Sequence, residues 1–80
     1  MKDLIEYIVK ALVDKPEEVV IGETQGESVI VIEIRVAPED AGKVIGREGR
    51  IINAMRTLAK AAGAEEKKRI TVEVITKEEK

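Results

Sequence analysis

Two glycines three residues apart, Gly46 and Gly49, interrupt a stretch whose apolar spacing is otherwise helical, and Arg47 and Arg50 lie at the break. Glycine in a helix interior costs roughly 1 kcal/mol relative to alanine, so a pair at one junction indicates a sharp turn or a closely approaching molecule. We expect both glycines to expose backbone N–H groups, and Gly49 to precede a new helix whose dipole favours an anion. A phosphate backbone fits this combination of bare main chain and positive charge.

The elements that must hold this break are two helices. Residues 38–45 predict a short helix that begins at Pro38 with two acidic residues in its first turn. Residues 50–62 predict a longer helix that ends at Gly63, with an apolar stripe facing the core. A plain glycine turn between two helices is the simpler reading of the same four residues.

The flanking segments predict one further helix and three strands. Apolar spacing after Asp3, the expected N-cap, predicts a helix that ends near Asp14. Residues 19–24 and 28–36 read as a hairpin, and residues 70–75 as a last strand between a charged loop (64–68) and a charged tail (77–80). In the second strand Ile30, Ile32, Ile34 and Val36 share one face, which we expect to be core.

This order, α-β-β-α-α-β, predicts the topology of an α+β fold. A crossover of two helices is long enough to make the second and third strands parallel neighbours, with the usual right-handed connection. The result is a three-stranded mixed sheet with the second strand central and the helices on one face. Eighty residues make one domain, residues 1–80, with a core of about residues 2–76.

Composition excludes several classes of function. The chain has no cysteine and no histidine, one serine and scattered carboxylates, so we expect no catalytic residue, metal site or cofactor. No apolar run approaches the length of a membrane span, and a cytoplasmic location is the default expectation. Charge is unevenly placed: residues 41–70 carry eight basic and three acidic side chains, net +5, and the remaining fifty residues carry net −7. A solvated charged face is the plainer explanation of this basic stripe; a local phosphate-binding footprint is the other.

The motif Ile-Gly-x-x-Gly-x-x-Ile of residues 45–52, followed by a helix, resembles the signature loop of KH domains, which clamp about four single-stranded nucleotides. The stretch Val-Ala-Pro-Glu-Asp-Ala-Gly-Lys-Val-Ile-Gly of residues 36–46 and the order of elements extend this likeness over about residues 2–76. The chain thus resembles small single-domain bacterial KH proteins of the KhpA type, with the type II KH fold. The resemblance implies single-stranded RNA as the ligand, a role as RNA chaperone or post-transcriptional regulator, and homodimers or pairing with a second KH-containing protein.

In such a fold the nucleic acid would lie between the glycine loop and the segment before the last strand, with base edges read by the backbone of the central strand. Glu48 would repel phosphate unless it turned outward or paired with Arg47 or Lys43. Ile34 is a further candidate for the apolar floor, although core packing is the ordinary role of such isoleucines. The expected RNA-binding residues are Lys43, Ile45, Gly46, Arg47, Glu48, Gly49, Arg50, Ile52, Asn53, Arg56, Lys67 and Lys68, with Lys60 and Arg69 as possible extensions.

A protein-interaction module is the alternative from another class. Val29, Val31 and Ile75 are expected on the sheet face away from the helices, where they would form a dimer surface even with little RNA affinity. The single aromatic residue, Tyr7, argues against domains that stack bases on aromatic rings. A third reading is that the chain is an isolated or engineered KH module from a larger RNA-processing protein.

Overall fold

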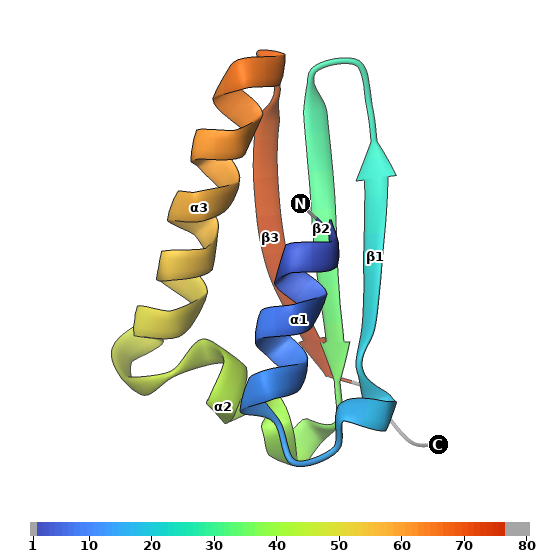
Figure 1. The fold of residues 1–80 in the computed structure, drawn as a ribbon, viewed down its shortest axis with the longest axis vertical. Helices are drawn as coiled ribbons and strands as arrows, with labels where there is room; N and C mark the ends of the chain where they lie inside the picture. The colour runs from blue at the N-terminus through green and yellow to red at the C-terminus, as the bar shows by residue number, and fades with distance from the viewer. Residues whose placement is uncertain (1, 77–80) are drawn as a thin grey trace.

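Three strands form one mixed sheet in the computed structural model, which describes residues 2–76. Strand β1 (Val20–Gln25) runs antiparallel to β2 (Val29–Val36), and β3 (Arg69–Thr76) runs parallel to β2 on its other side. The register sets Ile34 of β2 opposite Ile21 of β1 and Val74 of β3. The expected α+β architecture, with the second strand central, is confirmed (Figure 1).

Three helices cover one face of this sheet (Figure 1). They are α1 (Lys2–Leu12), the short α2 (Ala41–Ile45) and the long α3 (Arg50–Glu66). Three single turns of 3₁₀ helix, Pro16–Glu18, Pro38–Asp40 and Arg47–Gly49, precede β1, α2 and α3 respectively. The segment that connects β2 to β3 therefore contains both helices that flank the glycine loop.

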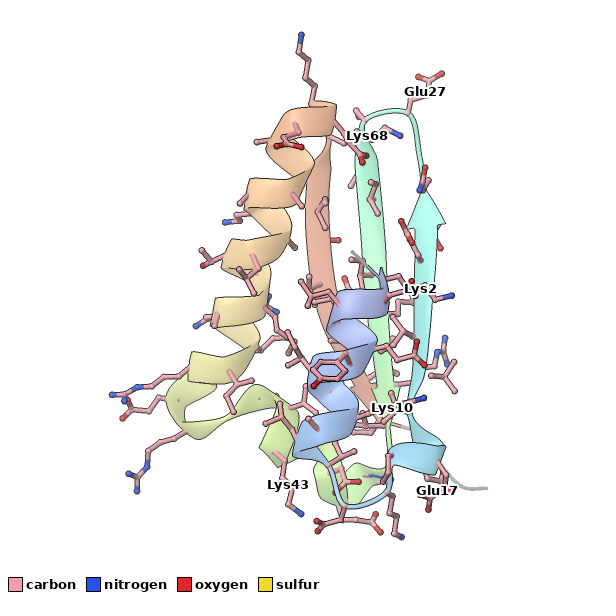
Figure 2. The ribbon with its side chains drawn as sticks, in the orientation of Figure 1. Lys2, Lys10, Glu17, Glu27, Lys43 and Lys68 are labelled. Carbon is pink, nitrogen blue, oxygen red and sulfur yellow. The ribbon has the colours of Figure 1, made fainter. Side chains whose placement is uncertain are left out.

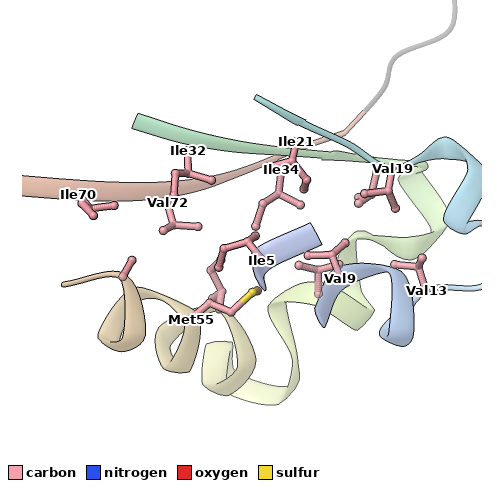
Figure 3. Packing of buried hydrophobic residues seen from close by; sticks show 14 of the residues in the cluster. Ile5, Val9, Val13, Val19, Ile21, Ile32, Ile34, Met55, Ile70 and Val72 are labelled. Carbon is pink, nitrogen blue, oxygen red and sulfur yellow. The ribbon is translucent and has the colours of Figure 1, made fainter. Parts of the chain in front are cut away.

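The layer between sheet and helices is aliphatic (Figure 3). The alternation in β2 points Ile30, Ile32, Ile34 and Val36 into this layer, as expected from the period of two. Met55 of α3 fills the space beneath them, while the one aromatic side chain, Tyr7, is 75% exposed on α1. The buried cluster comprises Ile5, Val9, Val13, Val19, Ile21, Ile30, Ile32, Ile34, Val36, Val44, Ile52, Met55, Ala59, Ile70 and Val72.

Helix α1 differs from the expectation at both ends. Asp3 lies in its first turn rather than at the N-cap, because the helix already includes Lys2. It ends at Leu12 instead of near Asp14, since the backbone N–H groups of Asp14 and Lys15 donate to the Asp40 carboxylate rather than to helix carbonyls. A contact across 25 residues thus decides where this helix stops.

Helix α3 does not end at Gly63, so that prediction is wrong. The helix continues to Glu66 and ends at Lys67, which adopts the left-handed conformation (φ 57°). Gly63 is buried, and a Cβ there would lie 2.7 Å from the Lys68 carbonyl oxygen and 2.8 Å from Ile70 Cγ1. The glycine is required for close packing against the start of β3, and the expected loop 64–68 shrinks accordingly. The expected charged tail, residues 77–80, lies outside the described residues.

Candidate nucleic-acid interface

The glycine loop joins α2 to α3 through three residues with positive φ among residues 46–49. Gly46 has φ 80° and ψ 171°, Glu48 has φ 57°, and Gly49 has φ 75°. A Cβ on Gly46 would lie 2.7 Å from Ile51 Cγ1, whereas a Cβ on Gly49 would find its nearest neighbour, Asn53 Nδ2, at 3.5 Å. Gly46 is therefore fixed by sterics and by φ, and Gly49 by φ alone.

Most amides expected to be free at this loop are already used. The Gly46 N–H donates to the Gly42 carbonyl (2.8 Å) and the Gly49 N–H to the Gly46 carbonyl (3.1 Å). The Arg50 N–H donates to the Arg47 carbonyl. The expectation that Gly46 and Gly49 expose their N–H groups is wrong, because the tight turn satisfies them internally. What the loop offers a phosphate is its arginine side chains and a surface without Cβ atoms.

The loop arginines differ in their surroundings. Arg50 Nη2 lies 3.6 Å from Glu48 Oε1, and both side chains are largely exposed. Of the two expected alternatives for Glu48, pairing with Arg47 or Lys43 is not seen: its largely exposed carboxylate lies beside Arg50 instead. Arg47 is exposed and takes part in none of the ion pairs formed within residues 2–76. Its guanidinium is the more available cation of the loop.

Lys43 lies on the far side of α2 from this arrangement of cations. Its ammonium group donates to Asp14 Oδ2 (2.6 Å) and lies 3.5 Å from Asp40 Oδ1. These two carboxylates raise the pKa of the Lys43 ammonium above its usual value, and the hydrogen bond that Lys43 donates to Asp14 is the largest cause. Figure 2 shows Lys43 at the lower end of the molecule. The structure thus separates Lys43 from the loop residues with which the sequence grouped it.

A hollow of about 280 Å³ lies between α3 and the outer edge of β3. Arg56 crosses it: its Nε donates to the Val72 carbonyl (3.2 Å) and its Nη1 to Asn53 Oδ1 (3.2 Å). Asn53 and Arg56 follow the loop by one to two turns of α3, so the hollow begins about two turns along the helix from the loop. Its lining residues are Arg56, Lys60, Ile70, Thr71, Val72 and Glu73.

The strand with free backbone groups beside the hollow is β3, an edge strand, and not the central strand; β1, the other edge strand, lies on the far side of β2. β2 pairs with β1 on one side and with β3 on the other, so the backbone N–H and carbonyl groups of β2 are used on both sides. This overturns the expectation that the backbone of β2 reads bases. In β3 the Arg69 N–H donates to Ser28 on the β2 side, while the Val72 carbonyl accepts from Arg56 on the outer side. Because residues alternate in direction along a parallel strand, Ile70, Val72 and Val74 direct their backbone groups to the free edge.

The remaining expected residues are spread over the molecule. Ile45 is 39% exposed beside the loop, whereas Ile52 is 5% exposed and Ile34 fully buried, so these two serve the core. Lys67 and Lys68 lie at the opposite end of α3 from the loop, which is 17 residues or about 25 Å away. Figure 2 places Lys68 beside the hairpin turn at Glu27. The structure brings together the loop, Asn53 and Arg56, and leaves the lysines as a separate cationic end.

Two parallel, hydrogen-bonded strands connected by two helices, with a Gly-x-x-Gly turn between the helices, define a KH domain. The chain belongs to the KhpA/KhpB KH-domain family, whose model matches residues 2–74. RNA-binding protein KhpA of Clostridium perfringens is 55% identical over 75 residues, covering 94% of this chain and all of the relative. The KhpA proteins of Chlamydia trachomatis (47% identity, 94% of this chain, 96% of the relative) and Borreliella burgdorferi (47%, 91% and 89%) are also similar.

No solved structure gives a significant match to the chain. Among the helices of residues 2–76, none has the length and apolar character needed to cross a bilayer. The same residues contain no group of three or more side chains suited to holding a metal ion.

Proposed function

We propose that this protein binds single-stranded RNA, with the phosphate backbone against the loop of residues 46–49 and the bases in the α3–β3 hollow. The observation that carries the proposal is the order of these features along one helix: Arg47 and Arg50 at the turn are followed on α3 by Asn53 and then by Arg56, which reaches the free edge of β3. Unpaired bases require such a combination of cationic rim and available hydrogen-bonding groups. Relatives named RNA-binding proteins support the choice of ligand.

The number of phosphate contacts sets the expected affinity. Arg47 and Arg50 at the loop, with Arg56 and Lys60 further along α3, are few cations, and Glu48 opposes them, so we expect a dissociation constant of about micromolar order with marked salt dependence. A single-stranded RNA that also reached Lys67 and Lys68 would have to follow α3 for its whole length. We propose that the single KH domain acts in the cytoplasm as an RNA chaperone or post-transcriptional regulator, for which weak, reversible binding is suitable.

Replacing both central loop residues, Arg47→Asp with Glu48→Asp, tests this function. Aspartate tolerates the left-handed conformation of residue 48 better than most residues, so the turn should persist. We expect RNA binding to fall by tenfold or more, on the order set by the loss of one phosphate contact and its replacement by a repulsive charge. Lys10→Asp on α1 makes the same change in net charge away from the loop and is the matched control.

An NMR titration with a short single-stranded RNA locates the contact. Amides of residues 45–53 and of β3 should shift first, and a duplex of the same sequence should produce smaller shifts. Full binding by the double loop variant, or first shifts elsewhere in the molecule, would remove the loop from the mechanism.

A second function, self-association, is favoured by the sheet face opposite the helices. Val20 is 47% exposed there, and Val29, Val31 and Ile75 on the same face are half-buried, with the ion pair of Glu33 and Arg35 among them. We propose this partly apolar face as a surface for a second copy or another KH-containing protein. Light scattering coupled to gel filtration, with Val31→Lys as the variant, tests it: a mass of one chain for the unaltered protein at high concentration would rule out the homodimer.

A further inference from the structure

Asp40 is the charged residue that the structure buries completely among residues 2–76, at 0% exposure. It stands at the N-cap of α2 but makes no side-chain hydrogen bond to its own helix. Its carboxylate instead accepts from the backbone N–H groups of Asp14 (3.2 Å, to Oδ1) and Lys15 (3.0 Å, to Oδ2), which follow α1. A residue placed to cap one helix therefore ties that helix to the end of another.

Ion pairs complete the same junction. Lys43, one turn into α2, bridges Asp40 and Asp14, and Lys15 pairs with Glu39 beside it. Burial alone would raise the pKa of the Asp40 carboxyl, but the two N–H groups and the Lys43 ammonium outweigh it and hold that pKa below its usual value. The carboxylate is thus kept charged inside the protein, a state that is retained only when partners satisfy it.

The position of this junction in the chain links it to the loop. Helix α2 has five residues, far fewer than a helix needs for stability on its own, so its orientation depends on what holds its ends. Val44 anchors it in the core, and Asp40 fixes its first turn. The next residues are Ile45 and the left-handed Gly46, so any tilt of α2 moves the loop directly.

We propose that Asp40 is a positioning residue for the RNA-binding loop, and that Lys43 belongs to this clamp instead of contacting phosphate. The inference rests on the proposed RNA-binding function of the loop. It assigns the two residues to the placement of Arg47 and Arg50, which would make the contacts themselves.

Asp40→Asn tests the clamp because charge and geometry predict opposite results. An asparagine offers one acceptor oxygen to two N–H donors and turns an NH₂ group toward one of them. Removing a negative charge should by itself tighten RNA binding, whereas a loosened clamp should weaken it by about tenfold. Glu17→Gln is the matched control: it removes an exposed charge at the same end of the molecule, and the Glu17 side chain forms no hydrogen bond or ion pair within residues 2–76.

Affinity is measured at a temperature where circular dichroism shows both variants folded, so that a change in stability alone leaves it unmoved. The RNA-free Asp40→Asn protein should also show displaced amide resonances at residues 46–50. Weaker binding with these displacements supports the clamp. Binding equal to or tighter than that of the unaltered protein overturns it.

Lys43→Met decides the question if Asp40→Asn does not fold. As part of the clamp, Lys43 affects affinity but not the dependence of binding on salt, because no phosphate contact is lost. A salt slope reduced by about 0.7 would show a direct phosphate contact and overturn the proposal, as would unchanged affinity. If the double loop variant binds RNA normally, the proposed function fails instead, and the amide resonances of RNA-free Asp40→Asn still test the clamp.

Discussion

Gly63→Ala should destabilise this protein, although the same change inside most helices stabilises them. Alanine is favoured over glycine in a helix interior by about 1 kcal/mol. The new Cβ would lie 2.7 Å from the Lys68 carbonyl oxygen and within 3 Å of two Ile70 side-chain atoms. The Lys68 backbone cannot easily retreat, because its N–H donates to the Gly63 carbonyl (3.1 Å) and the next residue is bonded to Ser28. Overpacking of this kind costs about 1–3 kcal/mol, and contact with backbone places it at the upper end.

The net loss is therefore about 2 kcal/mol, which for a domain of this size lowers Tm by roughly 8–16 °C. Urea unfolding followed by far-ultraviolet circular dichroism measures it. Gly42→Ala is the internal comparison: it lies in α2 with nothing within 4 Å of the added Cβ, and it should gain up to about 1 kcal/mol. A Gly63→Ala protein at least as stable as the original would refute the packing argument.

Three further changes test the site and the charged junction. Glu48→Gln releases Arg50 and should tighten RNA binding by up to about fivefold in a low-salt filter assay; weaker binding would contradict the assigned repulsion. Arg56→Met should weaken RNA binding severalfold, and the loss of its hydrogen bonds to Val72 and Asn53 should lower the free energy of unfolding by about 1–2 kcal/mol at most; unaltered affinity would exclude the hollow. The pKa values of the Asp40 and Glu39 carboxyls are lowered in the folded state, so their ionised forms stabilise the fold. This stabilisation is complete above about pH 5 and is lost as the pH falls through their ordinary pKa values near 4 and below. Thermal unfolding measured from pH 7 to pH 3 should show a smaller fall in Tm for Asp40→Asn than for the unaltered protein. An equal fall in Tm would mean that other carboxylates cause the loss of stability in acid.

The sequence was sufficient to predict the architecture, because the architecture follows from the periodicity of the apolar residues. Alternation in residues 28–36, helical spacing after residue 50 and the length of the crossover together predicted the strand order and the helical face, which the structure confirms. The glycine break at Gly46 and Gly49 was also found from local conformational cost, and both residues have positive φ.

What the sequence could not provide depends on contacts between distant segments. Gly63 was interpreted as the end of a helix, because the sequence does not reveal that the Lys68 carbonyl approaches this position too closely for a side chain. Lys43 was grouped with the loop arginines by proximity along the chain, while its partners Asp14 and Asp40 are fixed by the fold. Asp40 was interpreted as an acidic residue that complements the dipole of its own helix. No periodic pattern in the sequence indicates a carboxylate that accepts hydrogen bonds from the end of another helix. The choice of β3 over the central strand likewise requires knowing both neighbours of β2.

The parallel pairing of β2 with β3 has a consequence for assembly. β1 and β2 are joined by three residues, so their pairing is local, whereas 32 residues lie between the end of β2 and the start of β3. The intervening segment contains the glycine loop and α3, and its hollow has a second wall only after β3 has docked. Loop closure of this length is entropically costly and tends to come late. A hairpin with α1 would thus gain its ligand-ready surface in the final step of folding, and fraying of β3 would abolish that surface before the rest of the sheet melted.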